Sequence, residues 1–149
     1  MRLTTKGKYA VTALLDLSLN QSKSNFISLS KIALRQHIPA PYLEQLFRNL
    51  RKAGIVEAAR GPHGGYKLSR ESSSINVSEV VAAVEDKMDA TQCGGTVDCN
   101  SGKRCLAHDL WAELNNEVDN FLLSKSLEDV IGKKKNNTFA LDEDLIASG

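Results

Sequence analysis

Residues 41–68 read PYLEQLFRNLRKAGIVEAARGPHGGYKL, and this stretch decides the fold. Its first part places apolar residues at the i, i+3, i+4, i+7 spacing of a helix with one buried face: Leu43, Leu46, Phe47 and Leu50. Pro41 suits the first turn of this helix, and Gly54 suits its end. Beyond Gly54 the pattern changes to two short strands, 55–60 and 66–68, around a Gly- and Pro-containing turn that is typical of a β-hairpin.

Two more helices are expected before this stretch. The first begins after Thr4 or Thr5 and ends near Asn20. The second begins after Ser28 as its cap and ends near His37, because the HIPAP segment that follows disfavours helix. Two short helices joined by a tight break, with a basic hairpin after them, indicate a winged helix-turn-helix domain. The helix pair alone would fit an ordinary helical hairpin equally well.

The face of the 41–54 helix opposite its apolar stripe carries polar side chains: Tyr42, Glu44, Gln45, Arg48 and Arg51. We predict that this face reads DNA, because Gln45 can pair bidentately with adenine and Glu44 can accept from the cytosine amino group. Arg60, at the base of the hairpin tip, can reach into a minor groove, although an exposed turn arginine is the simpler alternative. Lys6 and Lys8, with the two arginines of the helix, are predicted to contact phosphates.

Charge is distributed unevenly along the chain although its net value is only +1. Residues 1–70 contain 12 Lys and Arg against 3 Asp and Glu, a net charge of +9. Residues 71–149 contain 7 against 15, a net charge of −8. Because phosphate neutralisation dominates the affinity of nucleic-acid binders, the basic first half favours double-stranded DNA as a partner over a merely solvated charged face.

The cysteines of the chain lie together at Cys93, Cys99 and Cys105, six residues apart, and His108 follows three residues later. Thiolates select iron–sulfur clusters, zinc or copper(I), and an imidazole can complete a set of four ligands. The segment also contains Gly, Asn and Ser, so it offers little apolar interior for small buried thiols. A metal or cluster site is therefore the leading hypothesis, with a disulfide between two of the cysteines as another alternative.

The second half of the chain predicts helices of two kinds. Asn76 and Glu79 have the spacing of a capping box, which predicts a helix from Val77. A longer helix over 106–123 carries apolar residues at intervals of three and four: Ala107, Leu110, Trp111, Leu114, Val118, Phe121 and Leu122. Too little chain remains to cover this stripe, so we expect a second copy to cover it in a homodimer. Residues 126–131 predict one more short helix.

These elements predict a mainly α chain with a small β-hairpin. We expect a winged helix-turn-helix region at 1–88, a cluster-binding loop at 89–105, a dimerisation helix with a short following helix at 106–131, and a disordered tail at 132–149. No apolar stretch approaches the roughly 18 residues of a membrane span, and the first residues lack the apolar core of a signal peptide. A cytoplasmic protein without membrane partners is therefore expected.

Four segments together resemble the Rrf2 family of bacterial transcription regulators, and within it the iron–sulfur cluster regulators. They are MRLTTKGKYAVTALLDL, YLEQLF, RGPHGGYKL and DATQC with the later CLAHDLW. The resemblance implies a dimeric regulator with a [2Fe–2S] cluster held by Cys93, Cys99, Cys105 and His108. It also implies DNA reading by Glu44, Gln45 and Arg60, control of cluster assembly genes, and the cluster assembly machinery as the source of the cluster. A symmetric dimer would in turn bind an imperfectly palindromic operator.

Other functions stay open on the sequence alone. A structural zinc site with the same four ligands would make the chain a constitutive DNA-binding protein. A nitric-oxide-sensing repressor of the same family is the nearest alternative regulator. An enzyme with a reactive cysteine needs a base and an oxyanion site in one pocket. We predict that the chain is not an enzyme, because it has only three histidines and the cysteine segment already accounts for one.

Overall fold

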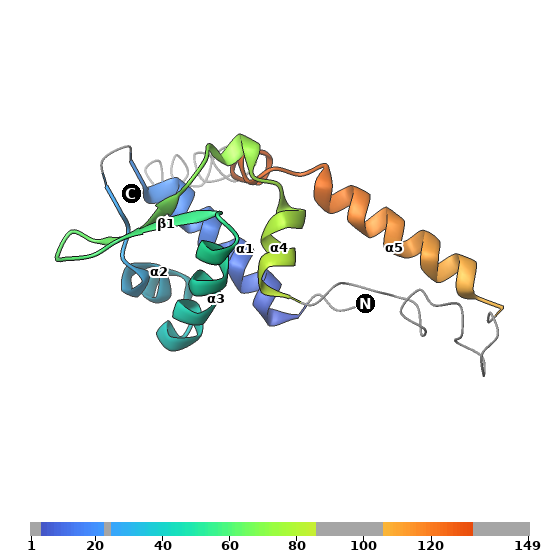
Figure 1. Cartoon of the computed structure of the whole chain (residues 1–149), viewed down its shortest axis with the longest axis horizontal. Helices are drawn as coiled ribbons and strands as arrows, with labels where there is room; N and C mark the ends of the chain where they lie inside the picture. The colour runs from blue at the N-terminus through green and yellow to red at the C-terminus, as the bar shows by residue number, and fades with distance from the viewer. Residues whose placement is uncertain (1–3, 23–24, 86–105, 133–149) are drawn as a thin grey trace, which may run out of the picture.

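The structure is a computed structural model that describes residues 4–22, 25–85 and 106–132 (Figure 1). Helices and strands follow in the order α1 (Thr5–Asn20), α2 (Leu29–Gln36), α3 (Ala40–Lys52), β1 (Val56–Ala59), β2 (Gly65–Leu68), the 3₁₀ turn η1 (Ser72–Ser74), α4 (Val77–Val84) and α5 (His108–Leu123). Residues 127–132 are also helical. The expected mainly α architecture with one small hairpin is confirmed.

The core lies where α1, α3 and α4 meet. Leu14 and Leu17 of α1 are fully buried, as are Phe47 of α3 and Val80 of α4. The four apolar residues predicted to face inward from α3 are all buried. α2 contributes Ile32 to the same core. Packing of these stripes fixes α3 against α1 and leaves its opposite face toward solvent.

The hairpin forms an antiparallel pair in which Val56 lies opposite Leu68. Ile27, from the segment before α2, adds a bridge to Tyr66, with both N–H to carbonyl distances at 2.8 Å. Gly65 has a φ of +143°, and a Cβ built there would lie 2.2 Å from the Ile27 carbonyl oxygen. Glycine is therefore required at this close approach. The ring of Tyr66 also packs edge-on against Phe47, 5.0 Å away, so the hairpin is anchored to α3.

A buried ionic group joins α1 to α2. Asp16 is 3% exposed, and Arg35 donates to its two carboxylate oxygens at 2.9 and 2.6 Å. Gln36 donates at 2.7 Å, and Asn20 adds a longer bond at 3.3 Å. Burial by itself raises the pKa of Asp16, but the hydrogen bonds and the positive charge of Arg35 outweigh it and hold the pKa below 3.8. The group sets the position of α2 relative to α1.

α4 begins at the predicted capping box, in which the Asn76 side chain accepts from the Glu79 N–H at 2.9 Å and Glu79 accepts from the Asn76 N–H at 3.2 Å. α5 extends away from the body of the domain (Figure 1). The segment that follows α5 returns to the start of α4, where the Val77 N–H donates to the Lys125 carbonyl at 2.8 Å. α5 is therefore tied to the body at its C-terminal end.

The ends of several elements differ from those predicted. α3 begins at Ala40, one residue earlier than predicted, with Pro39 as its cap. α5 begins at His108, whereas a start at residue 106 was predicted. Ser28 occupies the cap position of α2, but its side chain forms no capping hydrogen bond and lies 3.2 Å from the Ser30 hydroxyl instead. Among the helices of the described segments, each is too short or too polar to span a bilayer.

Candidate nucleic-acid interface

The outer face of α3 carries most of the side chains predicted to contact DNA. Glu44, Gln45, Arg48 and Arg51 are exposed. They lie opposite the stripe that ends in the core, because the helix repeats every 3.6 residues. The structure thus brings these four together on one helical surface.

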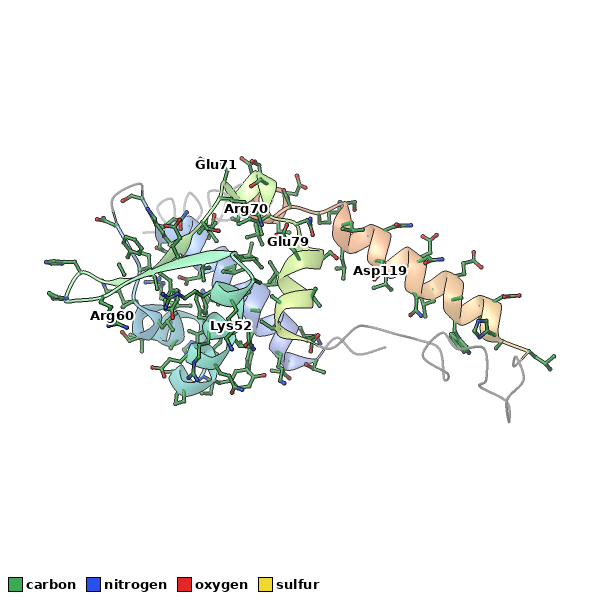
Figure 2. All side chains as sticks on the ribbon, in the orientation of Figure 1. Lys52, Arg60, Arg70, Glu71, Glu79 and Asp119 are labelled. Atoms are coloured by element: carbon green, nitrogen blue, oxygen red, sulfur yellow. The ribbon has the colours of Figure 1, made fainter. Side chains whose placement is uncertain are left out.

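The β1–β2 hairpin with its turn, residues 56–68, is the wing of the domain. It places Arg60 outside the body of the domain (Figure 2). Arg60 is exposed at the end of β1, directly before a turn in which the Gly64 N–H donates to the Gly61 carbonyl at 2.9 Å. Pro62 and His63 are the two central residues of this turn, and both are exposed. The wing therefore carries a cation beside a polar tip that projects past α3.

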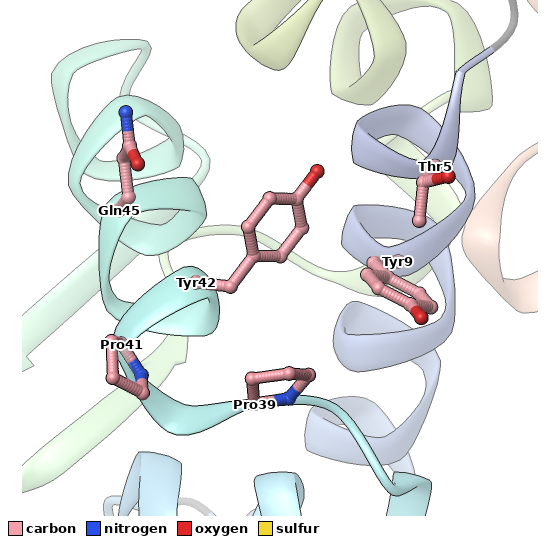
Figure 3. Close-up of a pocket in the computed structure, with 6 residues that line it drawn as sticks. All are labelled: Thr5, Tyr9, Pro39, Pro41, Tyr42 and Gln45. Atoms are coloured by element: carbon pink, nitrogen blue, oxygen red, sulfur yellow. The ribbon is translucent and has the colours of Figure 1, made fainter.

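The first turns of α1 adjoin the first turn of α3. Tyr9 and Tyr42 meet edge to face, with ring centroids 5.6 Å apart and planes at 85°. An open hollow of about 580 Å³ lies beside them, lined also by Thr5, Pro41 and Gln45 (Figure 3). Tyr42 is half-buried because of this contact. It differs in this from the four other predicted residues of α3, which are exposed.

The positive charge of this surface depends on which Lys and Arg side chains are ion-paired with a carboxylate. Arg35 and Arg70 are ion-paired, with Asp16 and with Glu79, and Lys67 lies 3.9 Å from Glu57. Within the described residues, the exposed cations predicted to contact DNA form no ion pair: Lys6, Lys8, Arg48, Arg51 and Arg60. Their charge is available to a polyanion.

Of the four predicted metal ligands, the structure describes only His108. Cys93, Cys99 and Cys105 lie outside them. His108 is the first residue of α5 and is 7% exposed. Within the described segments, no three His, Cys, Asp or Glu side chains come together as a metal site.

Sequence reasoning missed three side-chain contacts within the domain. They are the buried pair Asp16–Arg35, the aromatic pair Tyr9–Tyr42, and hydrogen bonds from Thr4 to Glu85. Only the first left a signal, because Asp16 is a lone carboxylate in the apolar run ALLDLSL. The other two depend on how helices far apart in sequence approach each other.

Comparison with known proteins gives consistent results. The family model Rrf2, described as iron-dependent transcriptional regulator, matches residues 3–133. The HTH-type transcriptional regulator IscR of Vibrio atlanticus is 52% identical over 122 residues, which are 82% of this chain and 70% of the relative. The solved structure of T. potens IscR has a TM-score of 0.73 at 31% identity, covering 90% of this chain and 88% of that one. CymR, the global cysteine regulator of B. subtilis, has a TM-score of 0.75 at 28% identity, covering 89% and 98%.

Three helices packed around a common core, with a hairpin directly after the third, define a winged helix-turn-helix protein. The matches to the solved regulators agree with this class. The chain belongs to the Rrf2 family of transcriptional regulators. Its relatives are named as regulators and not as enzymes, as the sequence predicted.

Proposed function

We propose that the chain binds double-stranded DNA through α3 in a major groove and the wing in the adjacent minor groove. The observation that carries this proposal is the distribution of cations. Two arginines on the outer face of α3, Arg60 on the wing, and two lysines on α1 are exposed and unpaired among the described residues. Their charge favours phosphate contacts, which orient a protein on the duplex.

The proposed roles within this interface follow from side-chain chemistry. Gln45 pairs with adenine, and Glu44 accepts from a cytosine amino group while opposing edges that carry only acceptors. Arg60 enters the minor groove. Arg48, Arg51, Lys6 and Lys8 contact phosphates, and Tyr42 supports the start of α3.

A homodimer through α5 would place two copies of α3 in successive major grooves roughly 34 Å apart, on an imperfect palindrome. The exposure of the α5 stripe supports this arrangement, because Leu110 is 57% and Phe121 is 61% exposed. An apolar hollow of about 420 Å³ lies beside the C-terminal end of α5 and is lined in part by Val11, Val77 and Leu122. Uncovered apolar surface of this kind favours a protein partner.

The DNA proposal is tested with duplexes that the wild-type protein selects from a random-sequence pool. We expect Arg60→Ala to weaken binding by about 1–3 kcal/mol, as for other specific arginine contacts. Arg60→Lys is the matched variant, since it keeps the charge and loses the planar fork, and it should recover part of the loss. Affinities are measured by anisotropy titration at one fixed salt concentration. Wild-type protein that selects no sequence would contradict the proposal.

We further propose that Cys93, Cys99, Cys105 and His108 hold a [2Fe–2S] cluster taken from the cluster assembly machinery. Three thiols and an imidazole are a donor set that fits iron in such a cluster, and His108 lies at the start of α5, three residues after the last thiol. A bound [2Fe–2S] cluster would report reversibly how much cluster the cell has available. The imidazole of His108 is a weaker donor than a thiolate, so its detachment would make the set more labile than four thiolates. The proposed regulon is the cluster assembly genes.

Anaerobic purification with iron and sulfide analysis tests the cluster proposal. We expect about two iron and two sulfide per chain with visible absorption, the composition of this cluster type. Cys99→Ala should lose the cluster, and His108→Cys should retain it more firmly, because a thiolate replaces a weaker donor. Zinc without a chromophore would instead support the constitutive DNA-binding alternative. Loss of operator binding on nitric oxide treatment alone, with no response to cluster removal, would favour the nitric-oxide sensor.

A further inference from the structure

We infer that Tyr9 is a positioning residue for α3, and that Glu85 fixes the helix turn that leads to Tyr9. These two side chains would then set operator selectivity without contacting DNA. The inference rests on the proposed reading of DNA by α3. It is carried by two contacts of α1. The ring of Tyr9 contacts Tyr42, and the cap residue Thr4 donates hydrogen bonds to Glu85.

The first contact fixes the start of the recognition helix. Tyr42 lies two residues before Glu44 and three before Gln45, so its position sets theirs. The cap residue Pro39 gives this end no side-chain hydrogen bond. Figure 3 shows Tyr42 and Tyr9 on facing sides of the space between α3 and α1. The edge-to-face pair, at 5.6 Å, is therefore a lateral support of this helix end, in addition to the buried Leu43.

The hollow beside the tyrosine pair makes this support adjustable. Its volume is about 580 Å³ and it is open to solvent along the first turns of both helices. Leu43 in the same turn is fully buried and holds the core side of this helix end, whereas the open hollow leaves the solvent side without close-packed neighbours. Movement of Tyr9 would thus be transmitted to Tyr42 and to the base-reading side chains beyond it.

The second contact fixes the start of α1. The Thr4 N–H donates to both carboxylate oxygens of Glu85, at 2.8 and 3.1 Å, and the Thr4 hydroxyl donates to the same carboxylate. That hydroxyl also accepts from the Lys6 N–H at 3.3 Å and so caps α1. A carboxylate at a helix N-terminus is further favoured by the helix dipole. Glu85 thereby holds the cap of α1.

Glu85 is itself held firmly. It is the C-cap of α4, and its N–H donates to the Val81 carbonyl at 2.9 Å. Val80 and Val84 anchor α4 in the core. In the sequence Glu85 stands eight residues before Cys93. A change in Glu85 would therefore reach α3 through Thr4, the first turns of α1, and Tyr9.

Operator titrations with matched variants test this route. The first probe is a duplex selected by wild-type protein. The second probe is the same duplex with one base pair changed at the position that Gln45 reads. This position is the one at which Gln45→Ala loses the sequence preference of the wild type. We expect Tyr9→Leu and Glu85→Ala to lower the affinity ratio of the two duplexes by about fivefold or more, within the range that one bidentate base contact supplies. Tyr9→Phe keeps the ring edge and should retain the wild-type ratio. The double variant should lose no more than the larger single loss, because both act on one route.

The outcomes separate positioning from its alternatives. If Tyr9→Phe lowers the affinity ratio of the two duplexes as much as Tyr9→Leu does, the ring edge is not the support and the inference is wrong. An unchanged ratio in Tyr9→Leu with a lowered melting temperature would show a purely structural role. Additive losses in the double variant would separate Glu85 from Tyr9 and break the route. Wild-type protein that selects no duplex would remove the proposed function, and the inference with it.

Discussion

At the residue scale, the buried carboxylate Asp16 illustrates how one side chain fixes the angle between two helices. A charge in the core is tolerated only when hydrogen bonds replace its hydration. Arg35, Gln36 and Asn20 supply those bonds at distances of 2.6–3.3 Å. Because Arg35 is used in this way, it differs from the unpaired cations proposed to contact phosphates.

Replacing Asp16 with Ala should lower the free energy of unfolding by about 2–3 kcal/mol, because Arg35 and Gln36 lose their charged acceptor. The folded-state pKa of Asp16 lies below 3.8. Its stabilising effect is therefore complete above that value and is lost as the pH falls through the lower, folded-state pKa. Urea titrations between about pH 2 and pH 7 should show a shallower acid loss in Asp16→Asn than in wild type. Parallel acid losses in the two proteins would contradict this.

Individual contacts were the least predictable part of the structure. The apolar spacing of α1 predicted that helix, but the pairs Tyr9–Tyr42 and Thr4–Glu85 require tertiary approach that no local pattern encodes. The predicted metal ligands illustrate a different limit. Clustering of the cysteines indicates a site, whereas the spacing alone does not select between iron and zinc.

At the scale of elements, the sequence predicted α3 and the hairpin well, because both depend on periodicity and on turn-forming residues. Their ends shifted by a residue or two, because the apolar pattern does not fix the last residue of an element. Ser28 shows a different limit, since it occupies the predicted cap position of α2 but its hydroxyl lies beside Ser30 and forms no capping hydrogen bond. The outward direction predicted for the polar residues of α3 is confirmed for the four exposed ones.

Glu44 should determine which operators are bound more than how tightly DNA is bound. It is exposed on α3 beside Gln45, and a carboxylate opposes phosphates in general while accepting only from donor-bearing base edges. We expect Glu44→Ala to allow cluster-free protein to bind operators that otherwise require the cluster. Glu44→Gln is the matched variant, since it removes the charge and keeps the side-chain length. It should also allow cluster-free protein to bind these operators if the negative charge of Glu44 is what excludes them.

The measurement for Glu44 is an anisotropy titration of each variant, with and without cluster, at one salt concentration. The two probes are an operator selected by cluster-loaded wild-type protein and one selected by cluster-free wild-type protein. Equal loss of affinity on every operator and in both states would identify Glu44 as a plain stabilising contact. Selectivity would then have to be controlled by other residues of α3.

At the scale of the whole molecule, α5 is the element least explained by one copy of the chain. In the described part of the chain, His108 is its single buried residue, and its apolar stripe is exposed or half-buried. A core helix of this length would bury that stripe. The prediction of a dimerisation helix therefore accounts for a pattern that packing among the described residues leaves unexplained.

Leu114→Glu should convert the dimer to a monomer, because it places a charge in the middle of the apolar seam. Asn116→Glu is the matched control, since it adds the same charge at an exposed position on the same helix and should leave the dimer intact. Sedimentation equilibrium measures the oligomeric state, and titration of a palindrome and of a single half-site measures DNA binding. Leu114→Glu should lose affinity mainly for the palindrome, because the second half-site no longer binds intramolecularly. Wild-type protein that sediments as a monomer and still binds the palindrome with full affinity would show that α5 serves another partner.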